Sequence, residues 1–332
     1  MRRPRIETVV LGLMALVLLL GPAAAVAQAP DYPTKPIEII VPFVPGGGTD
    51  LTARLVADYL GKKWGQPILV VNKPGGGGMI GARAALKESR PDGYTILIDI
   101  HTTSSMHIGA SKNPLLTLAD RKYAGRIVRD PMVFAVKADA PWKNFKEFSD
   151  WVKANPAELV WSTVGPAGPS RYTAYDWMTQ IGVDPTKTKM VITEGASDSF
   201  AKLAGGHVVL SIHSVAEAQA MTKAGKIKLL AVLSPTRIKY IPDVPTAAEQ
   251  GVMKGVRVQW WASVAFPAGT PDPIVKQWEG AIAEMVKDPA FLVGAERISM
   301  NIDHLPAAAM RAFVEKEVEG YTDMATKIGI RR

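Results

Sequence analysis

Three consecutive glycines, Gly46-Gly47-Gly48, separate an apolar run at residues 37–42 from a segment with helical periodicity that begins at Thr49. Glycine costs backbone entropy, so its repeated use here indicates that something must approach the bare main chain. A helix N-terminus carries unpaired N–H groups and partial positive charge, which attract anions. The run therefore predicts an anion site, either for a phosphate handled by an enzyme or for another small anion.

A phosphate site fits the neighbouring residues poorly. A nucleoside-triphosphate loop needs Lys and then Ser or Thr after its last glycine, whereas Thr49-Asp50 follow Gly48. A second run at residues 75–81 matches the dinucleotide pattern G-x-G-x-x-G, but residues 72–74 separate it from its strand where a tight turn is required. We therefore expect both loops to hold a carboxylate through main-chain N–H groups. For either loop alone, a plain turn with Thr49 or Asp50 capping the helix is the alternative.

Catalysis would need a nucleophile with a base or a cluster of metal ligands, and no such motif occurs in the sequence. The five histidines are scattered and cysteine is absent, so we expect no metal and no cofactor. His101 and His107 flank the polar stretch 102–105, and His213 follows another strand, so these side chains are candidates for a ligand cleft. An ordinary surface loop is the alternative for 102–105. We interpret Trp260-Trp261 as core packing.

Strand-like and helix-like patterns alternate along the chain, as in α/β proteins whose sheets are covered on both faces. We expect strands at residues 37–42, 68–71, 95–100, 132–136, 159–162, 190–192, 208–212, 227–233 and 257–265. We expect helices at residues 49–64, 79–87, 145–154, 170–181, 197–203 and 215–223, and two long closing helices around residues 274–285 and 310–324. The pattern is unclear at residues 123–130.

The two alternating series predict two α/β lobes, the second inserted into the first. Residues 30–127 with 235–332 form lobe one, which carries both glycine loops, and residues 128–234 form lobe two. Ligands of such sheets bind at the carboxyl ends of strands and between lobes. Both glycine loops lie at such ends.

Residues 1–27 have the organisation of a cleavable secretory signal peptide. Arg2, Arg3 and Arg5 precede an apolar run at residues 9–20, and small residues lead to a cleavage site near Ala27. The apolar run is shorter than the roughly 20 residues that a membrane-spanning helix needs, and an uncleaved anchor is the alternative. An exported chain without cysteine has no disulfide. We therefore expect a periplasmic protein.

The formal net charge is +8 for the full chain. The basic residues do not form a block of five or more, so we expect no nucleic-acid partner. A mild positive surplus helps to attract small anions. We expect a monomer.

Short motifs follow one another in a fixed order along the chain. They are Val41-Pro42-Phe43 with Gly46-Gly47-Gly48-Thr49-Asp50, Asn72-Lys73-Pro74-Gly75, Pro91-Asp92-Gly93-Tyr94, Asp243-Val244-Pro245-Thr246 and Pro267-Ala268-Gly269-Thr270. Together they resemble the Bug-type periplasmic receptors, the solute-binding proteins of tripartite tricarboxylate transporters. The resemblance implies a two-lobe Venus-flytrap fold of the type II periplasmic-binding-protein kind, each lobe a mixed, mostly parallel sheet flanked by helices. It also implies capture of a small organic anion and its delivery to a membrane permease.

The resemblance further implies that the lobe-one loops hold one carboxylate and that the lobe-two loops select the far end of the ligand. The expected contacts in lobe one are Phe43, Val44, Gly47, Gly48, Thr49, Asp50, Asn72, Gly76, Gly77, Gly78, Thr102, Thr103 and Ser104. Those in lobe two are Gly165, Ala167, Gly168, Ser170, Arg171, Glu194, Gly195, Ala196 and His213.

Lobe two departs from the family pattern at two places. Arg171 stands near the position of a family histidine, and Thr193-Glu194-Gly195-Ala196 lacks the family lysine and gains an acid. A guanidinium holds a carboxylate through two parallel N–H bonds, so the expected ligand is a dicarboxylate or an aromatic carboxylate. A solvated surface arginine is the alternative for Arg171. The alternative function is a secreted α/β hydrolase or lyase that uses Glu194, Asp198 or a histidine.

Overall fold

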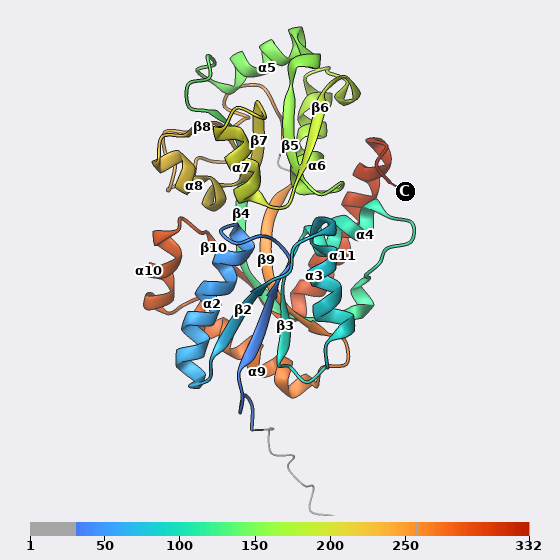
Figure 1. Ribbon diagram of the computed structural model, residues 1–332, viewed down its shortest axis with the longest axis vertical. Helices are drawn as coiled ribbons and strands as arrows, with labels where there is room; N and C mark the ends of the chain where they lie inside the picture. The colour runs from blue at the N-terminus through green and yellow to red at the C-terminus, as the bar shows by residue number, and fades with distance from the viewer. Residues whose placement is uncertain (1–30, 256–257, 332) are drawn as a thin grey trace, which may run out of the picture. The chain divides into compact units, whose positions relative to one another are not determined.

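The computed structural model describes residues 31–255 and 258–331 of the 332-residue chain. The chain divides into two units, Met1–Tyr32 and Pro33–Arg332. Only residues 31 and 32 of the first unit are described, so the expected signal peptide lies outside the described residues. The fold is that of the second unit (Figure 1).

The sheet of lobe one is built around a parallel core. Its strands are β1 (Ile37–Val41), β2 (Ile68–Asn72), β3 (Thr95–Ile100), β9 (Gln259–Pro267), β10 (Ile302–Leu305) and the first part of β4 (Arg121–Lys137). β1 runs parallel to both β2 and β3, whereas β9 is antiparallel to β3 and to β4. The β1 sequence IEIIV is apolar at four of its five positions and mostly buried, as expected of a central strand.

The sheet of lobe two has the same mixed character. Its strands are β5 (Val160–Val164), β6 (Lys189–Thr193), β7 (Leu210–Ser214), β8 (Ile227–Leu233) and the last part of β4. β5 runs parallel to β6 and β7, and β4 is antiparallel to β7 and β8. Residues 121–131 of β4 pair with β9 and residues 132–137 pair with β8, so β4 passes from one lobe into the other (Figure 1). The two-lobe α/β fold class is confirmed.

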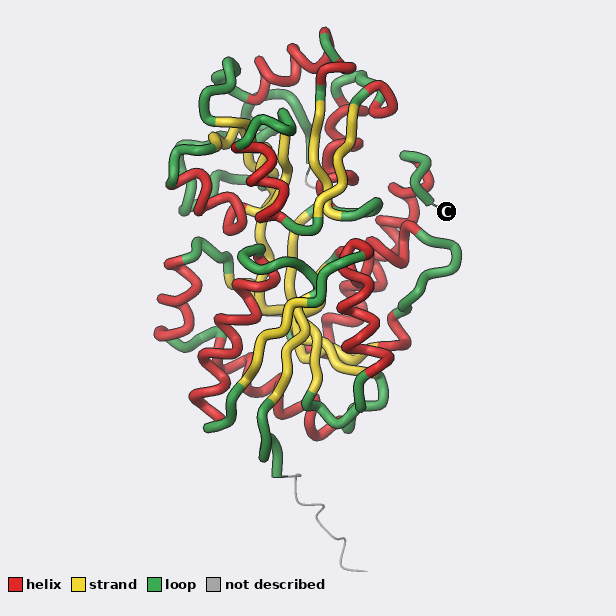
Figure 2. Tube along the Cα trace, viewed as in Figure 1, coloured by secondary structure: helices red, strands yellow, loops and turns green. Residues whose placement is uncertain are grey.

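Helices flank the sheets of both lobes (Figure 2). Those of lobe one are α2 (Gly48–Trp64), α3 (Met79–Arg83), α4 (His107–Ala110), α9 (Asp272–Met285), α10 (Pro289–Arg297) and α11 (Ala307–Lys327). Those of lobe two are α5 (Phe145–Ala154), α6 (Pro169–Gln180), α7 (Ala196–Ala204) and α8 (Val215–Lys223). α2 ends at Gly65, whose φ of 63° provides the left-handed C-terminal cap that glycine favours.

Each lobe has its own apolar core, which holds its strand-end loops in place. The lobe-one core includes Ile40, Leu97, Trp261, Met310 and Val314. The lobe-two core includes Val133, Phe200, Val215, Val232 and Ile241. Trp261 is fully buried, as its interpretation as a core residue predicts.

The unclear stretch at residues 123–130 lies within β4. Two arginines of this strand are buried, each with an acidic partner from a distant segment. Arg121 pairs with Asp99 at 2.6 Å, and Arg126 pairs with Asp303 at 2.9 Å. The prediction that the strand begins at residue 132 is therefore wrong, because β4 begins at Arg121, 11 residues earlier. The first part of the strand has no regular alternation of apolar residues from which it could be recognised.

Other elements also differ from expectation. Residues 84–88 form a π-helical turn that continues α3, and residues 102–106 form a π-helical turn rather than a loop. α10 and β10 were not predicted from the sequence. The strand expected from residue 257 begins at Gln259 in the described part of the chain, and residue 257 itself lies outside it.

Candidate functional site

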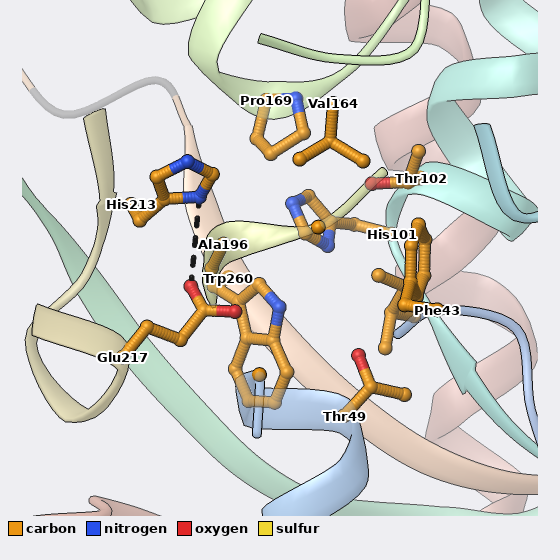
Figure 3. Close-up of a pocket in the computed structure, with 13 residues that line it drawn as sticks. Phe43, Thr49, His101, Thr102, Val164, Pro169, Ala196, His213, Glu217 and Trp260 are labelled. Carbon is orange, nitrogen blue, oxygen red and sulfur yellow. Dashed lines mark ion pairs between the residues drawn. The ribbon is translucent and has the colours of Figure 1, made fainter. Parts of the chain in front are cut away.

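The carboxyl ends of strands from both lobes surround one pocket of about 370 Å³ (Figure 3). This volume includes space that is open to solvent. The free volume inside the pocket is about 30 Å³, well below the roughly 300–1,000 Å³ of small-molecule sites, so a ligand is admitted only when the pocket walls move apart. Residues that follow β1 and β3 line it from lobe one, residues that follow β5, β6 and β7 line it from lobe two, and β9 adds a tryptophan. The lining residues are Phe43, Gly47, Thr49, Ile100, His101, Thr102, Val164, Pro169, Gly195, Ala196, His213, Glu217 and Trp260.

The first glycine loop is fixed by the buried carboxylate of Asp50. This carboxylate accepts hydrogen bonds from the Gly46 N–H at 3.0 Å, from Arg54 at 2.9 and 3.0 Å, and from the Asn72 amide at 3.0 Å. Asn72 also donates to the Phe43 carbonyl at 3.0 Å, which ties the end of β2 to the loop. Burial alone would raise the pKa of Asp50, but the hydrogen bonds outweigh it and hold the pKa below its ordinary value.

The N-terminus of α2 opens into the pocket. Gly47 at the cap position provides no side-chain cap, because glycine has none. The first N–H group of the helix, that of Gly48, donates to Oε1 of Glu217 at 3.0 Å. Glu217 belongs to α8 in lobe two, so a carboxylate of one lobe lies at the helix N-terminus of the other. The following N–H groups of the first turn have no partner within the helix.

Glu217 is held at the start of α8 by reciprocal capping. The Ser214 N–H donates to Oε2 of Glu217 at 3.0 Å, and the Glu217 N–H donates to the Ser214 hydroxyl at 3.4 Å. Asp130 of β4 accepts the Ala216 N–H at 2.9 Å. Burial raises the pKa of Asp130 to about 7, since the hydrogen bond from Ala216 and nearby donors only partly compensates. This helix end therefore carries two acidic side chains.

Two buried histidines line the pocket without being charged. Burial lowers the pKa of His101 to about 3. Burial also lowers the pKa of His213, and the nearby Glu217 offsets this only in part by raising the same pKa. The His213 Nδ1 lies 3.8 Å from Oε2 of Glu217, and its Nε2 makes no hydrogen bond within the described chain. Neither ring nitrogen of His101 has a partner there.

The second glycine loop brings the lobes together. Gly75, Gly76, Gly77 and Gly78 all have positive φ, a conformation that other residues rarely adopt. A Cβ on Gly78 would lie 2.7 Å from the Phe43 ring, so only glycine fits there. Gly77 meets a glycine of lobe two, because a Cβ on Gly165 would lie 2.7 Å from the Cα of Gly77.

The structure brings many of the expected contact residues to this cleft. Seven line the main pocket, namely Phe43, Gly47, Thr49, Thr102, Gly195, Ala196 and His213. A neighbouring hollow of about 270 Å³ is lined by Gly76, Gly77, Gly165, Ala167 and Gly168. Another of about 620 Å³ includes Gly78 and Glu194. Around these spaces, Val44 lies in the loop after β1, Gly48 and Asp50 lie in the first turn of α2, and Asn72 is the last residue of β2.

The remaining expected residues point elsewhere. The Thr103 hydroxyl donates to Asp99 at 2.6 Å, and the Ser104 hydroxyl bonds to Tyr123. Both side chains are buried, because residues 102–106 are a packed helical turn and not the surface loop that was the alternative. The Ser170 hydroxyl donates to the Ile212 carbonyl at 2.5 Å.

Arg171 does not line the pocket. Its Nη1 donates to the Pro166 carbonyl at 2.6 Å, and its guanidinium lies 5.2 Å from the centre of the Tyr175 ring. It therefore stabilises the loop and helix to which it belongs. In this structure the positive charge expected at the far end of the ligand is turned toward its own lobe.

Sequence reasoning missed several lining residues, above all Glu217 and Trp260. The Ser214-x-x-Glu217 spacing is a capping-box signature directly after a strand, so the position of Glu217 at a strand end could have been found. Trp260 was expected in the core and is almost fully buried, but it faces the pocket beside Gly48, where a Cβ would lie 3.1 Å from its ring.

Within residues 31–255 and 258–331, no group of three or more histidine and acidic side chains is arranged to hold a metal ion. In the same stretches, no helix has the length and apolar character needed to span a bilayer.

The two lobes and the pocket between their strand ends define a solute-binding protein of the periplasmic kind. The periplasmic binding protein BugD has the same fold, with a TM-score of 0.82 and 28% identity over 90% of this chain and 99% of that chain. The R. palustris protein Rpa4515, solved with adipate, has a TM-score of 0.83 and 27% identity over 90% of this chain and 99% of its own.

The chain belongs to the tripartite tricarboxylate transporter family receptors. The model of that family matches residues 52–330. A UPF0065 protein of Bordetella pertussis is 31% identical over 271 residues, which are 81% of this chain and 82% of that protein. The resemblance to Bug-type receptors is confirmed. The family is one of solute receptors of periplasmic-binding-protein fold.

Proposed function

We propose that this chain captures a small carboxylate in the pocket between its lobes and delivers it to the permease of a tripartite transporter. One observation carries the proposal: the N-terminus of α2 opens into a pocket formed by strand-end loops of both lobes, and a carboxylate, that of Glu217, already lies at its first N–H group. A helix N-terminus offers N–H donors and partial positive charge to an anion without any charged side chain.

The lobe-one loops are the proposed carboxylate site. Thr49 supplies a hydroxyl and Gly47 a bare backbone in the pocket, while Asp50 and Asn72 hold the loop in shape. Gly76 and Gly77 add main-chain N–H groups at the neighbouring hollow. The adipate-bound R. palustris relative supports an aliphatic carboxylate as one kind of ligand.

The lobe-two loops are the proposed selectivity element. Gly195, Ala196 and His213 face the pocket from this side. We place the lobe boundaries at residues 127/128 and 234/235, with residues 30–127 and 235–332 in lobe one. We further propose export to the periplasm, cleavage of the signal peptide near Ala27, and action as a monomer.

Ligand-dependent stabilisation without turnover tests the proposal. The mature chain is heated with a panel of mono-, di- and aromatic carboxylates, and its free energy of unfolding is compared with and without each acid. A ligand at 100 times its dissociation constant adds about 2.7 kcal/mol. A panel that leaves stability unchanged would overturn the proposal. Conversion of a carboxylate by the purified chain would instead favour the hydrolase or lyase alternative.

A further inference from the structure

The main pocket contains a buried acid that the glycine loops do not explain. The Glu217 side chain is 8% exposed and lines the pocket from the lobe-two side. Its two oxygens accept main-chain N–H groups of Gly48 and Ser214, each at 3.0 Å. A carboxylate oxygen has lone pairs for more than one donor, so each oxygen retains capacity for a ligand. Glu217 therefore makes the lobe-two wall of the pocket acceptor-rich where this wall meets the N-terminus of α2.

No basic side chain balances this acid at the pocket wall. Among the lining residues in the described part of the chain there is neither lysine nor arginine. Arg171, the nearest candidate from the sequence, donates to the Pro166 carbonyl instead. The two lining histidines are neutral, since burial lowers the pKa of each. A second carboxylate here would face Glu217 without a counter-charge, an arrangement that disfavours ionised pairs.

Unpaired histidine nitrogens leave polar atoms available to a ligand at this end of the pocket. The His213 side chain is 3% exposed, and its Nε2 has no hydrogen-bond partner in the described chain. His101 is fully buried, and neither of its ring nitrogens is bonded there. Buried polar atoms are normally paired, so each unpaired one requires an explanation. Figure 3 shows both rings among the side chains that surround the cavity, together with the aromatic rings of Phe43 and Trp260.

We propose that Glu217 is a specificity-determining residue that selects a monocarboxylate bearing an ammonium or hydroxyl group, and that it rejects the matching dicarboxylate. The inference rests on the proposed function, with the ligand carboxylate at the second lobe-one glycine loop, residues 75–78, because Glu217 itself lies at the N-terminus of α2. The donor group of the ligand then lies at Glu217 and the unpaired histidine nitrogens. An ammonium is favoured over a hydroxyl, because Trp260 and Phe43 line the same pocket and aromatic faces attract cations.

Matched ligands test this on the wild-type chain at neutral pH. One series is hexanoate, 6-hydroxyhexanoate, 6-aminohexanoate and adipate, and a five-carbon series has the same end groups. An aromatic series is benzoate, 4-hydroxybenzoate, 4-(aminomethyl)benzoate and terephthalate. In the series that binds best, calorimetry is expected to give at least about tenfold tighter binding of the amino or hydroxy acid than of the diacid. A diacid that binds as tightly as the amino acid would overturn the inference.

The Glu217→Gln variant distinguishes the effect of the Glu217 charge on ligand selectivity from the effect of its size and shape. It retains an oxygen for the Gly48 N–H, and we expect it to lose about tenfold or more in affinity for the amino acid while gaining affinity for the diacid. Glu158→Gln is the matched control, because it makes the same change in net charge at an exposed position outside the pocket. Equal changes for all ligands of a series would overturn the role of Glu217.

These outcomes are distinct from failure of the proposed function. If diacids bind well to wild type, the chain is still a carboxylate receptor and only the selectivity inference is wrong. If no acid of any series binds, the receptor proposal itself fails. Should the Glu217→Gln variant not fold, the wild-type ranking of end groups still decides.

Discussion

At the scale of single residues, Gly48 is where the two lobes meet over the proposed carboxylate site. Its N–H donates to Glu217, and a Cβ at this position would lie 3.1 Å from both the Glu217 Cγ and the Trp260 ring. At Gly47 a Cβ would meet nothing closer than 3.8 Å, and its φ of −83° suits any residue. Gly48 is therefore in tight contact with Glu217 and Trp260, whereas Gly47 has room for a side chain.

We predict that Gly48→Ala weakens ligand binding much more than Gly47→Ala. The methyl group at 48 forces Glu217 or Trp260 to move and so opens the lobes at the site, whereas the methyl group at 47 enters ordinary contact distance. Calorimetric titration of both variants with the best-bound carboxylate measures the difference, with circular dichroism as the check on folding. We expect a loss of at least about tenfold, or about 1.4 kcal/mol, for Gly48→Ala alone. Similar affinities for the two folded variants would contradict this role of Gly48.

The lobe-one half of the site could be predicted from sequence because its residues depend on local rules. Glycines between the end of a strand and the start of a helix predict a main-chain anion site, and this pattern can be recognised within one short segment. Glu217 and Trp260 were not predicted as site residues, because they reach the pocket only through packing between segments far apart in sequence. The prediction for Arg171 assumed that its side chain faces the cleft, and a carbonyl in its own loop binds it instead.

At the scale of elements, the start of α8 combines the pocket acid with a second, deeper acid. Asp130 accepts the Ala216 N–H, and burial raises its pKa to about 7 from an ordinary value of 3.8. The folded state therefore keeps this proton up to about pH 7, while the unfolded chain releases it near pH 4. Between these values the native state binds more protons, so Asp130 makes the free energy of unfolding fall as pH rises.

We predict that Asp130→Asn becomes progressively more stabilising relative to wild type from pH 5 to about pH 7, and that the difference then levels off. The amide cannot ionise, so the variant lacks the loss of up to about 1.4 kcal/mol per pH unit that a single group can cause. Urea unfolding at several pH values measures the difference between variant and wild type. Other groups with shifted pKa values, such as Glu317 and His101, titrate in both proteins and cancel.

Asp58→Asn is the control for this series. Asp58 is exposed, and its substitution also replaces one carboxylate by an amide. The control should show a difference that does not change with pH across this range. A pH-independent difference for Asp130→Asn as well would mean that Asp130 is ionised in the folded state at pH 5.

Most helices and strands could be predicted because the repeat of apolar residues runs through the whole of each segment. α5, α8 and β8 begin and end where the pattern predicts. The first part of β4 was not, because Arg121 and Arg126 occupy buried positions that only their partners Asp99 and Asp303 make tolerable. β10 is four half-buried residues that pair irregularly with β4, a pattern too short and too weak to recognise in advance.

At the scale of the whole molecule, residues of the two lobes touch around the pocket. The Ser197 hydroxyl donates to the Pro45 carbonyl at 3.1 Å, and a Cβ on Gly195 would lie 2.7 Å from Val44. Gly77 and Gly165 are in contact at the second glycine loop. With the lobes this close and a free volume of about 30 Å³ in the main pocket, we expect binding and release of a ligand to require the lobes to separate.

A disulfide across the lobes tests this requirement, and the cysteine-free chain allows it cleanly. A Cβ on Gly46 would lie 3.9 Å from the Cβ of Ser197, within the usual disulfide range of about 3.5–4.5 Å. We predict that the oxidised Gly46→Cys/Ser197→Cys double variant neither takes up nor releases ligand, and that reduction restores exchange. The positive φ of Gly46 makes the substitution cost about 1 kcal/mol or more, and the single Gly46→Cys variant controls for this strain. Stopped-flow binding before and after reduction gives the rates, and unchanged rates with the thiols fully oxidised would show that the lobes need not open.

The central claim is that a carboxylate lies at the lobe-one glycine loops, between the lobes. A crystal structure of the mature chain with its best-bound carboxylate tests it most directly. The account predicts carboxylate oxygens at about 3 Å from N–H groups of residues 47–50 or 76–78, with the rest of the ligand against Trp260 and His213. A ligand bound outside the pocket, or one whose carboxylate makes no contact with either glycine loop, would contradict it.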